Sequence, residues 1–175
     1  MLTTKEIRSL FAELNVRLAE AGMRGEIGIV GGAAMCLVYN ARESTRDVDA
    51  VFAPAGEIRA MAARIAQEKG IGKDWLNDAV KGYIEKGFER EIVLQLSHLH
   101  VWTPEPRYLL AMKCVSARFD SHDGDDIRFL IRHLGLRKID QVLSVIEKYY
   151  PRDRVPAKTS FFLEEVIEGL NDRSE

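Results

Sequence analysis

The chain has 175 residues, of which 46% are hydrophobic and 30% charged, as in an ordinary globular protein with a core of its own. A formal net charge of −2 and a pI of about 6.1 exclude an overall positive field for nucleic acid and leave room only for a local basic patch. The charged N-terminal segment and the shortness of every apolar run argue against a signal peptide and a membrane-spanning helix, so we expect a cytoplasmic protein.

Helical and extended patterns alternate in the first part of the chain. In chain order we expect a helix over 4–20, a strand over 26–30, a helix over 33–39, a strand over 47–53 and a helix over 56–69. Thr3 or Thr4 caps the first helix and Gly22 ends it, while Pro54 ends the second strand. A loop with a short helix should follow over residues 74–88.

Alternating apolar residues then predict a strand pair, and after Pro104 the pattern becomes helical. The strands are expected over 91–96 and 98–103, and the helices near 105–118, 124–134, 138–149 and 159–171. The pattern predicts one α/β (α+β) domain over residues 1–175, with a small mixed sheet flanked by helices in residues 1–104 and a helical extension, residues 105–175, packed on it.

The two cysteines, Cys36 and Cys114, both lie in apolar helical patterns. We interpret them as reduced core residues, with a disulfide or a metal site as the alternative.

Asp47 and Asp49 open the second strand, with Val48 between them. Residues i and i+2 of a strand face the same side, roughly 6.6 Å apart, so the two carboxylates should lie together and repel each other. A divalent cation, Mg²⁺ or Mn²⁺, would relieve this repulsion, and Mg²⁺ is often bound by one or two carboxylates plus substrate phosphates. The alternative is a solvated strand end.

Gly31 and Gly32 join a strand to a helix, an arrangement that lets backbone amides face an anion. The alternative is a tight turn that needs a positive φ or close packing. Combined with Asp47 and Asp49 in the next strand, the glycines predict a phosphate-binding turn beside a metal site.

The stretch GGAAM…ARESTRDVDAVF resembles the core motif of minimal nucleotidyltransferases, in which a G-G or G-S turn precedes a D-x-D strand. The pattern is most similar to AbiEii-type toxins and related bacterial nucleotidyltransferase-like proteins, which also carry an R-x-[ST]-x-D-x-D strand entry and a later K…R…D-x-x-D helix pair. The later part is matched by LLAMKCVSARFDSHDGDDIRFL, residues 109–130.

This resemblance implies a nucleotidyltransferase fold and transfer of a nucleoside monophosphate from an NTP to an acceptor. It implies Asp47 and Asp49 as metal ligands and catalytic residues, with Gly31, Gly32, Thr45 and Arg46 at the nucleotide. RNA, particularly a tRNA end, is the acceptor that the toxin relatives suggest, and an antitoxin protein would be the partner.

Three departures from the family pattern stand out. Gly32 replaces the serine of the G-S form, and Arg42 lies five residues before Asp47, where the pattern has four. Many nucleotidyltransferases supply a third carboxylate from a following strand, and here Glu91 is the only acidic candidate there. Gly32 and the missing third carboxylate favour the competing hypothesis of a non-catalytic module that binds a nucleotide or a protein, whereas the intact pair of Asp47 and Asp49 argues against it.

Lys113 lies beside an apolar helical stripe, with Leu109 and Leu110 one turn before it and Ala117 one turn after it. A buried charge needs a partner, and Asp126, the last residue of the D-x-x-D pattern, is the catalytic candidate for that role, with Asp125 next to it. We expect the lysine amine to lie in one cleft with Asp47 and Asp49 and to reach a phosphate. The alternative is a lysine that extends along the apolar surface to solvent.

An RNA acceptor needs a local basic face, for which the sequence offers Arg42, Arg46, Arg118, Arg128 and Arg132. Two histidines, His98 and His100, have no evident third metal ligand and are interpreted as structural or exposed. In the stretch DWLND, Trp75 and Leu76 should pack in the core, while Asn77 and Asp78 could line the cleft.

Overall fold

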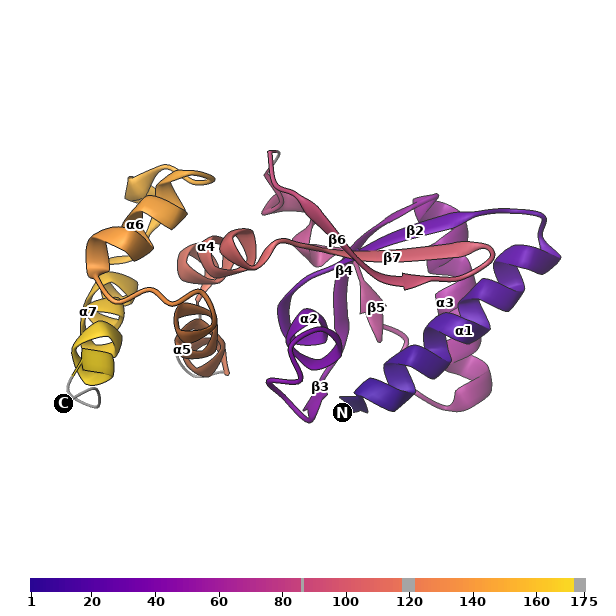
Figure 1. Ribbon diagram of the computed structural model, residues 1–175. Helices are drawn as coiled ribbons and strands as arrows, with labels where there is room; N and C mark the ends of the chain where they lie inside the picture. Colours follow the sequence, from indigo (N-terminus) through magenta and orange to yellow (C-terminus); the bar gives the residue numbers. More distant parts are fainter. Residues whose placement is uncertain (86, 118–121, 172–175) are drawn as a thin grey trace. The chain divides into compact units, whose positions relative to one another are not determined.

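The computed structural model of the protein describes residues 1–85, 87–117 and 122–171 (Figure 1). The chain folds into two compact units. The first comprises residues 1–83 and 90–104, and the second comprises residues 84–89 and 105–175.

The first unit contains the predicted strands and the first three helices. Its elements are β1 (Leu2–Thr3), α1 (Thr4–Glu20), β2 (Gly25–Ile29), α2 (Gly31–Leu37), β3 (Ser44–Thr45), β4 (Val48–Ala53), α3 (Ala55–Lys69), β5 (Leu76–Asn77), the 3₁₀ helix η1 (Ala79–Gly82), β6 (Arg90–Gln95) and β7 (Leu99–Pro104). The expected elements are confirmed to within a few residues, the ordinary uncertainty of element ends.

Local chemistry explains how the first helix begins and ends. The Thr3 hydroxyl accepts a hydrogen bond from the Glu6 amide while the Glu6 carboxylate accepts one from the Thr3 amide, which makes a capping box. At the other end Gly22 takes the left-handed conformation, with a φ of 64°, and turns the chain toward β2.

Five strands form a mixed sheet in the order β5-β4-β2-β7-β6. β2 is antiparallel to β4 and parallel to β7, β4 is parallel to β5, and β6 and β7 form an antiparallel hairpin. A separate two-stranded sheet pairs β1 with β3. The mixed sheet expected from the sequence is therefore present.

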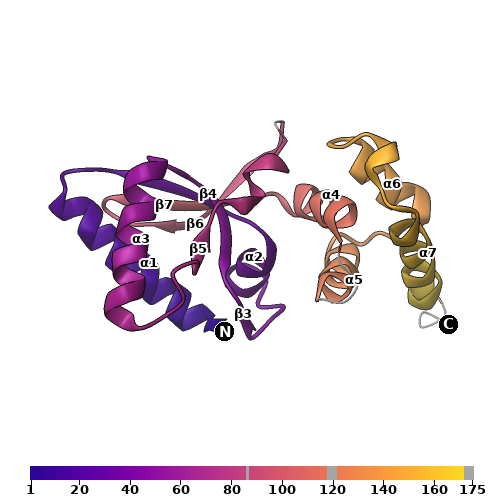
Figure 2. The same ribbon diagram turned by 180° about the vertical axis from the view of Figure 1, so that it is seen from behind.

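Helices α1 and α3 pack against one face of this sheet (Figures 1 and 2). Ile27, Ile29 and Ala50 point to that face, and Leu18 of α1 and Ile58 of α3 close over Gly25. On the opposite face the Trp102 ring lies on Gly28, where an added Cβ would be only 2.2 Å from it. The core of the unit thus lies between the sheet and the two helices.

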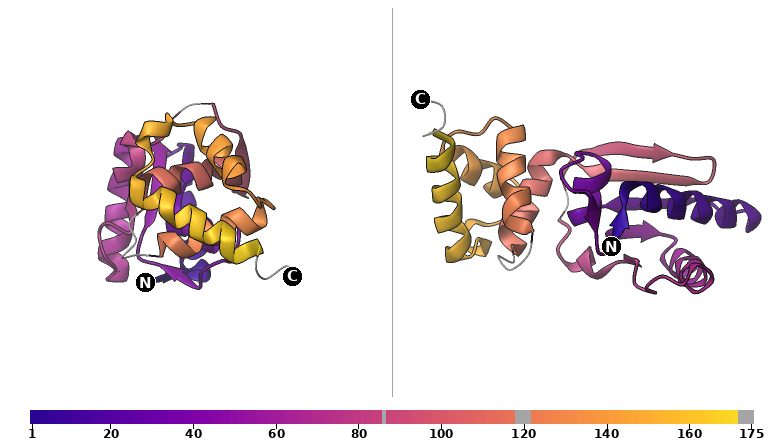
Figure 3. Two further views of the ribbon diagram at one scale, coloured as in Figure 1. Left: turned by 90° about the vertical axis from the view of Figure 1, so that its left-hand side faces the viewer. Right: turned by 90° about the horizontal axis from the view of Figure 1, so that it is seen from below.

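The second unit is helical, as expected (Figure 3). Its elements are α4 (Pro106–Ser116), α5 (Asp123–His133), α6 (Ile139–Glu147), the 3₁₀ helix η2 (Arg152–Arg154) and α7 (Ala157–Asn171). That it packs on the first unit stays a prediction.

Tyrosines bind the short segment 84–89 into this unit. The Tyr108 hydroxyl accepts a hydrogen bond from the Glu85 amide at 2.7 Å and another from the Tyr150 hydroxyl at 3.0 Å. Arg154 forms an ion pair with Glu85 at 2.9 Å, and the Phe88 and Tyr108 rings lie 4.3 Å apart. Tyr149 and Tyr150 are both buried packing residues.

Both cysteines are buried free thiols, which confirms their interpretation as core residues. Within residues 1–85, 87–117 and 122–171, no helix combines the length and the apolar character that crossing a membrane requires.

Candidate active site

Asp47 and Asp49 lie on the same face of the sheet, the face that is turned away from α1 and α3. Ala50 pairs with Ile29 and points toward the helices, so its neighbour Asp49 points the other way. Asn77, the register partner of Asp49 on β5, donates a hydrogen bond from Nδ2 to Asp47 Oδ2 at 3.3 Å, which puts Asp47 on the same side. Val48 between them is fully buried. The prediction that the two carboxylates face the same side is confirmed. The strand β4 begins at Val48, one residue later than expected.

Gly31 brings the strand-to-helix turn against the second carboxylate. Its φ of 59° is in the left-handed region that favours glycine, and an added Cβ would lie 3.2 Å from Asp49 Oδ2. A side chain at this position would therefore be strained and would also press on the carboxylate. The turn therefore lies close to the Asp49 carboxylate.

Gly32 is packed by side chains from the loop that precedes β4. A Cβ added there would lie 2.3 Å from Thr45 Oγ1 and 3.2 Å from an Arg42 guanidinium nitrogen. The absent serine of the G-S form is thus explained, because the Thr45 hydroxyl occupies the space into which a side chain at position 32 would project. Thr45 is only 5% exposed, whereas Arg46 points to solvent.

The turn, Thr45 and Asp49 are therefore brought together as the sequence predicted. The backbone conformation and the close packing account for both glycines without a ligand, so the phosphate role of the turn stays a prediction. The helix that follows, α2, has only seven residues, which limits any contribution from its dipole.

Glu91 does not complete this site. It lies on β6 opposite Thr103 of β7, while the aspartates lie at β4, and the strands β2 and β7 separate β4 from β6. Three strand spacings correspond to ~14 Å, which is too far for one cation to be shared. The suggestion of Glu91 as the third carboxylate is therefore wrong, because the hairpin places it at the far edge of the sheet.

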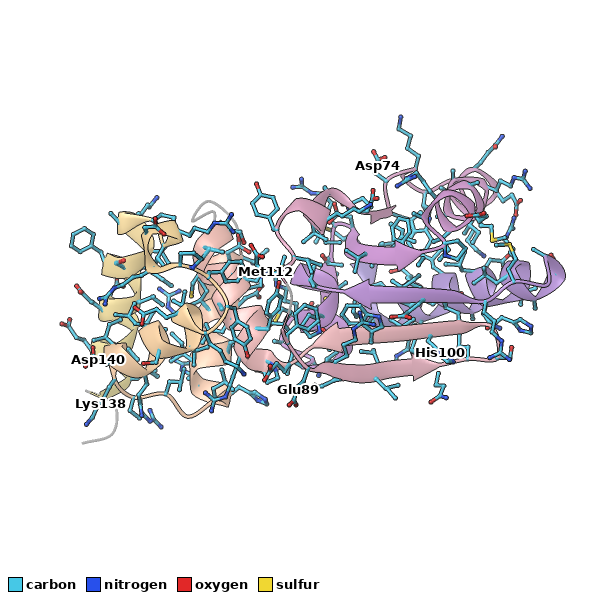
Figure 4. All side chains as sticks on the ribbon, turned by 90° about the horizontal axis from the view of Figure 1, so that it is seen from above. Asp74, Glu89, His100, Met112, Lys138 and Asp140 are labelled. Atoms are coloured by element: carbon cyan, nitrogen blue, oxygen red, sulfur yellow. The ribbon has the colours of Figure 1, made fainter. Side chains whose placement is uncertain are left out.

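The donor set around Asp47 and Asp49 fits Mg²⁺ or Mn²⁺, which prefer carboxylate oxygens supplemented by substrate phosphates and water. The described part of the chain contains no group of three His, Cys, Asp or Glu side chains placed to hold a metal, so the protein offers two carboxylates here and no third. His98 lies in the turn before β7, and His100, on that strand, is exposed (Figure 4).

In the second unit, Lys113 of α4 is held by two carboxylates at the start of α5. Its Nζ lies 2.6 Å from Asp126 and 2.8 Å from Asp123, and the exposed fractions of the Lys113 and Asp126 side chains are 8% and 2%. Such a buried cation is stabilised by paired carboxylates because an uncompensated charge in this environment is costly. The predicted partnership of Lys113 with Asp126 is confirmed, and the alternative of a lysine extending to solvent is wrong.

The suggestion of Asp125 as an alternative partner of Lys113 is wrong. Its side chain is 75% exposed and pairs with Arg128 at 3.3 Å. Asp123 takes its place because residues three apart share a helix face. The i, i+3 spacing of Asp123 and Asp126 was a signal in the sequence that would have identified both partners. The prediction that Lys113 shares a cleft with Asp47 and Asp49 stays a prediction.

The arginines proposed for an RNA-binding face are divided between the units. Arg42 and Arg46 belong to the first unit, and Arg128 and Arg132 to the second. Arg128 also stacks 4.7 Å from the centre of the Phe162 ring, while Arg132 is exposed. Arg118 lies outside the described residues.

A comparison with protein families gives one match that bears on this site. The model described as "Nucleotidyltransferase of unknown function (DUF6036)" matches residues 5–157, which cover most of both units and all the candidate residues above. No curated protein and no solved structure matches the chain.

Proposed function

Because the chain belongs to the DUF6036 family of nucleotidyltransferases of unknown function, we propose that it transfers a nucleoside monophosphate from an NTP to an acceptor. An acceptor oxygen would bond to the α-phosphorus as pyrophosphate leaves, with Asp47 and Asp49 as the centre of the reaction. The observation that carries this proposal is the shared face of the two carboxylates beside the Gly31–Gly32 turn. A family match alone gives the class of protein, whereas this arrangement supplies a place for the chemistry.

Asp47 and Asp49 would hold Mg²⁺ or Mn²⁺, which when bound neutralises phosphate charge and orients the triphosphate. The Gly31–Gly32 turn lies against Asp49 and Thr45, so a triphosphate held at the aspartates would lie beside the backbone of the turn. The Thr45 hydroxyl, packed on Gly32, is available as a hydrogen-bonding group beside the turn, and the exposed Arg46 adds a positive charge near it. Positioning and electrostatics dominate phosphoryl-transfer chemistry, and these residues supply both.

Lys113 and Asp126 are assigned a separate role within the second unit. Asp126 and Asp123 fix the position of the lysine amine, and that amine would stabilise phosphate charge. The same ion pairs also join α4 to α5, so a purely structural role for this cluster is the competing interpretation. Substitution of Lys113 distinguishes the two only where stability and transfer are measured together.

The finer proposal concerns the acceptor and the biological role. By resemblance to AbiEii-type toxins, the acceptor would be an RNA end, such as that of tRNA, and the protein would act as the toxin of a bacterial toxin–antitoxin pair. The exposed Arg46 and Arg132 are the residues that we assign to RNA phosphates.

A second candidate function is a binding module that holds a nucleotide or a protein without turnover. The observation in its favour is that the neutral Asn77 lies beside the two aspartates. Among the described residues, no third carboxylate is placed with them to hold a metal. A module that holds a nucleotide would bind Mg²⁺ and an NTP without transfer, whereas a module that holds a protein would show no NTP binding.

Transfer is tested by incubating the full-length protein with each α-³²P-labelled NTP, Mg²⁺ and bulk tRNA, and by measuring label in the RNA. The proposal predicts incorporation from at least one NTP by the wild type and a loss of at least 100-fold in Asp49→Asn. Binding of an NTP without incorporation of any of the four would favour the module. Incorporation that is unchanged in Asp49→Asn would overturn the assignment of the site.

A further inference from the structure

Asn77 lies next to both aspartates and places a neutral amide beside their two carboxylates. Its strand β5 is parallel to β4, and the register places Asn77 beside Asp49. From there its side chain reaches along the strand to Asp47. One neutral amide therefore adjoins both carboxylates.

Two hydrogen bonds fix the orientation of this amide. The Ala79 backbone N–H donates to Asn77 Oδ1 at 3.2 Å, a local turn that Asn forms readily two residues before its donor. Because Oδ1 accepts this bond, the NH₂ group is the end that faces Asp47 Oδ2, at 3.3 Å. The amide can thus donate to the carboxylate and hold it in one rotamer.

The residues on either side anchor the strand that carries Asn77. Trp75 is 3% exposed and donates from Nε1 to the Ala62 carbonyl of α3 at 3.0 Å, and its own carbonyl accepts from the Val48 amide at 2.7 Å. On the other side Asp78 forms an ion pair with Arg59 of α3 at 2.6 Å. A side chain on a segment anchored in this way can position a neighbour, because it does not move freely with solvent.

We propose that Asn77 is a positioning residue that orients Asp47 for cation binding and keeps the charge of this three-residue corner at −2. The inference rests on the proposed function, since it assigns a cation to Asp47 and Asp49. Partners that orient a metal ligand typically change metal affinity 10–100-fold when they are removed. With two charges rather than three, the corner is suited to a cation that arrives with a triphosphate, whose oxygens supply the remaining ligands.

The test is titration of the protein with Mn²⁺ alone. Calorimetry measures the affinity for the metal, and thermal unfolding measures the change in melting temperature that the metal causes. Asn77→Ala should weaken Mn²⁺ binding about 10–100-fold. Asn77→Asp keeps the size and the acceptor for Ala79 but puts a third negative charge beside Asp47. It should therefore melt below the wild type without metal and show a larger rise in melting temperature with Mn²⁺ than the wild type does.

Asp74→Asn is the matched control, because it makes the same carboxylate-to-amide change in an exposed side chain three residues before Asn77, and its Mn²⁺ affinity should equal that of the wild type. If Asn77 has only a structural role, Asn77→Ala and Asn77→Asp will melt lower by amounts that Mn²⁺ does not change, and the inference is overturned. The result also separates the two proposals. Wild-type binding that Asp49→Asn abolishes but Asn77→Ala leaves intact refutes the role of Asn77 alone. Mn²⁺ binding that is unchanged in Asp49→Asn, or that is absent in the wild type even when an NTP is added with the metal, refutes the cation site itself.

Discussion

The two acidic pairs Asp123–Asp126 and Asp47–Asp49 differ in what surrounds them. Asp123 and Asp126 enclose the Lys113 amine, so that cluster already contains its cation. Asp47 accepts a hydrogen bond from the neutral Asn77 and shares its face with Asp49. The first cluster can stabilise the fold by itself, whereas the second is suited to a cation from solution.

The buried cluster leads to a prediction with a control one residue away. Asp126→Asn keeps the shape of a side chain that is 2% exposed but removes its charge, so Lys113 loses half of its compensation. We expect a loss of about 3 kcal/mol in the free energy of unfolding. Asp125→Asn changes a side chain that is 75% exposed and should alter stability by less than about 0.5 kcal/mol. Urea denaturation of the two variants measures both values, and equal losses would show that burial of the pair is unimportant.

The thiols give a second prediction at this scale. Burial raises the pKa of Cys114 to about 12, and Cys36 is equally inaccessible. Because the thiolate is the reactive form, Ellman's reagent should modify neither cysteine in the native protein at pH 8 and both after denaturation. Rapid modification of the native protein would contradict the packing of α2 and α4 described here.

At the scale of elements, hydrophobic periodicity predicted the long strands and helices because each of them buries one face. It could not predict β1, β3 and β5, since two residues are too few to show a period. This limit matters for the site. β5 is the strand that puts Asn77 beside Asp49, and only its pairing with β4 shows that the amide and the two carboxylates share one face.

The sequence also predicted the strand-to-helix turn but not the contacts that the turn makes. Two adjacent glycines indicated a turn, but the contact between Gly32 and Thr45 joins residues thirteen apart through a loop without periodicity. The Glu91 suggestion was wrong for a related reason. Its place in a strand was evident, whereas the order of strands in the sheet was not.

Substitution of Gly32 tests that contact. Gly32→Ala places a Cβ 2.3 Å from Thr45 Oγ1, which should cost about 1–3 kcal/mol of stability. The double variant Gly32→Ala/Thr45→Ala removes the obstructing hydroxyl and should lose less than the sum of the two single variants. Gly56→Ala is the control, because nothing lies within 4 Å of an added Cβ there, and in α3 it should be neutral or slightly stabilising. Additive effects in the double variant would show that the two side chains do not compete for the same space.

At the scale of the whole molecule, the sequence predicted a change from mixed to helical structure at Pro104. The boundary in sequence between the last segments of the two compact units lies at this residue. Hydrophobic patterning could not assign residues 84–89, which lie between two segments of the first unit. They join the second unit because Tyr108 and Arg154 bind Glu85 across 23 and 69 residues of sequence.

The division gives a spectroscopic prediction, because Trp75 and Trp102 both lie in the first unit. Tryptophan fluorescence therefore reports on that unit, while far-UV circular dichroism reports on the helices of both. Since each unit has its own core, Asp126→Asn should shift the dichroism transition in urea to lower concentration more than it shifts the fluorescence transition. Identical shifts would show that the two units unfold as one cooperative body.

The most direct test of the central claim is the melting temperature of the wild type and of Asp47→Asn/Asp49→Asn, each with and without Mg²⁺ and an NTP. Ligand at 100 times its Kd stabilises a folded protein by about 2.7 kcal/mol, so binding gives a clear shift. We predict a Mg²⁺-dependent rise with at least one NTP for the wild type and none for the double variant. Without ligand, the variant should melt at or slightly above the wild-type temperature, because the repulsion between two like charges is gone. A Mg²⁺–NTP shift of undiminished size in the double variant would contradict the site proposed here.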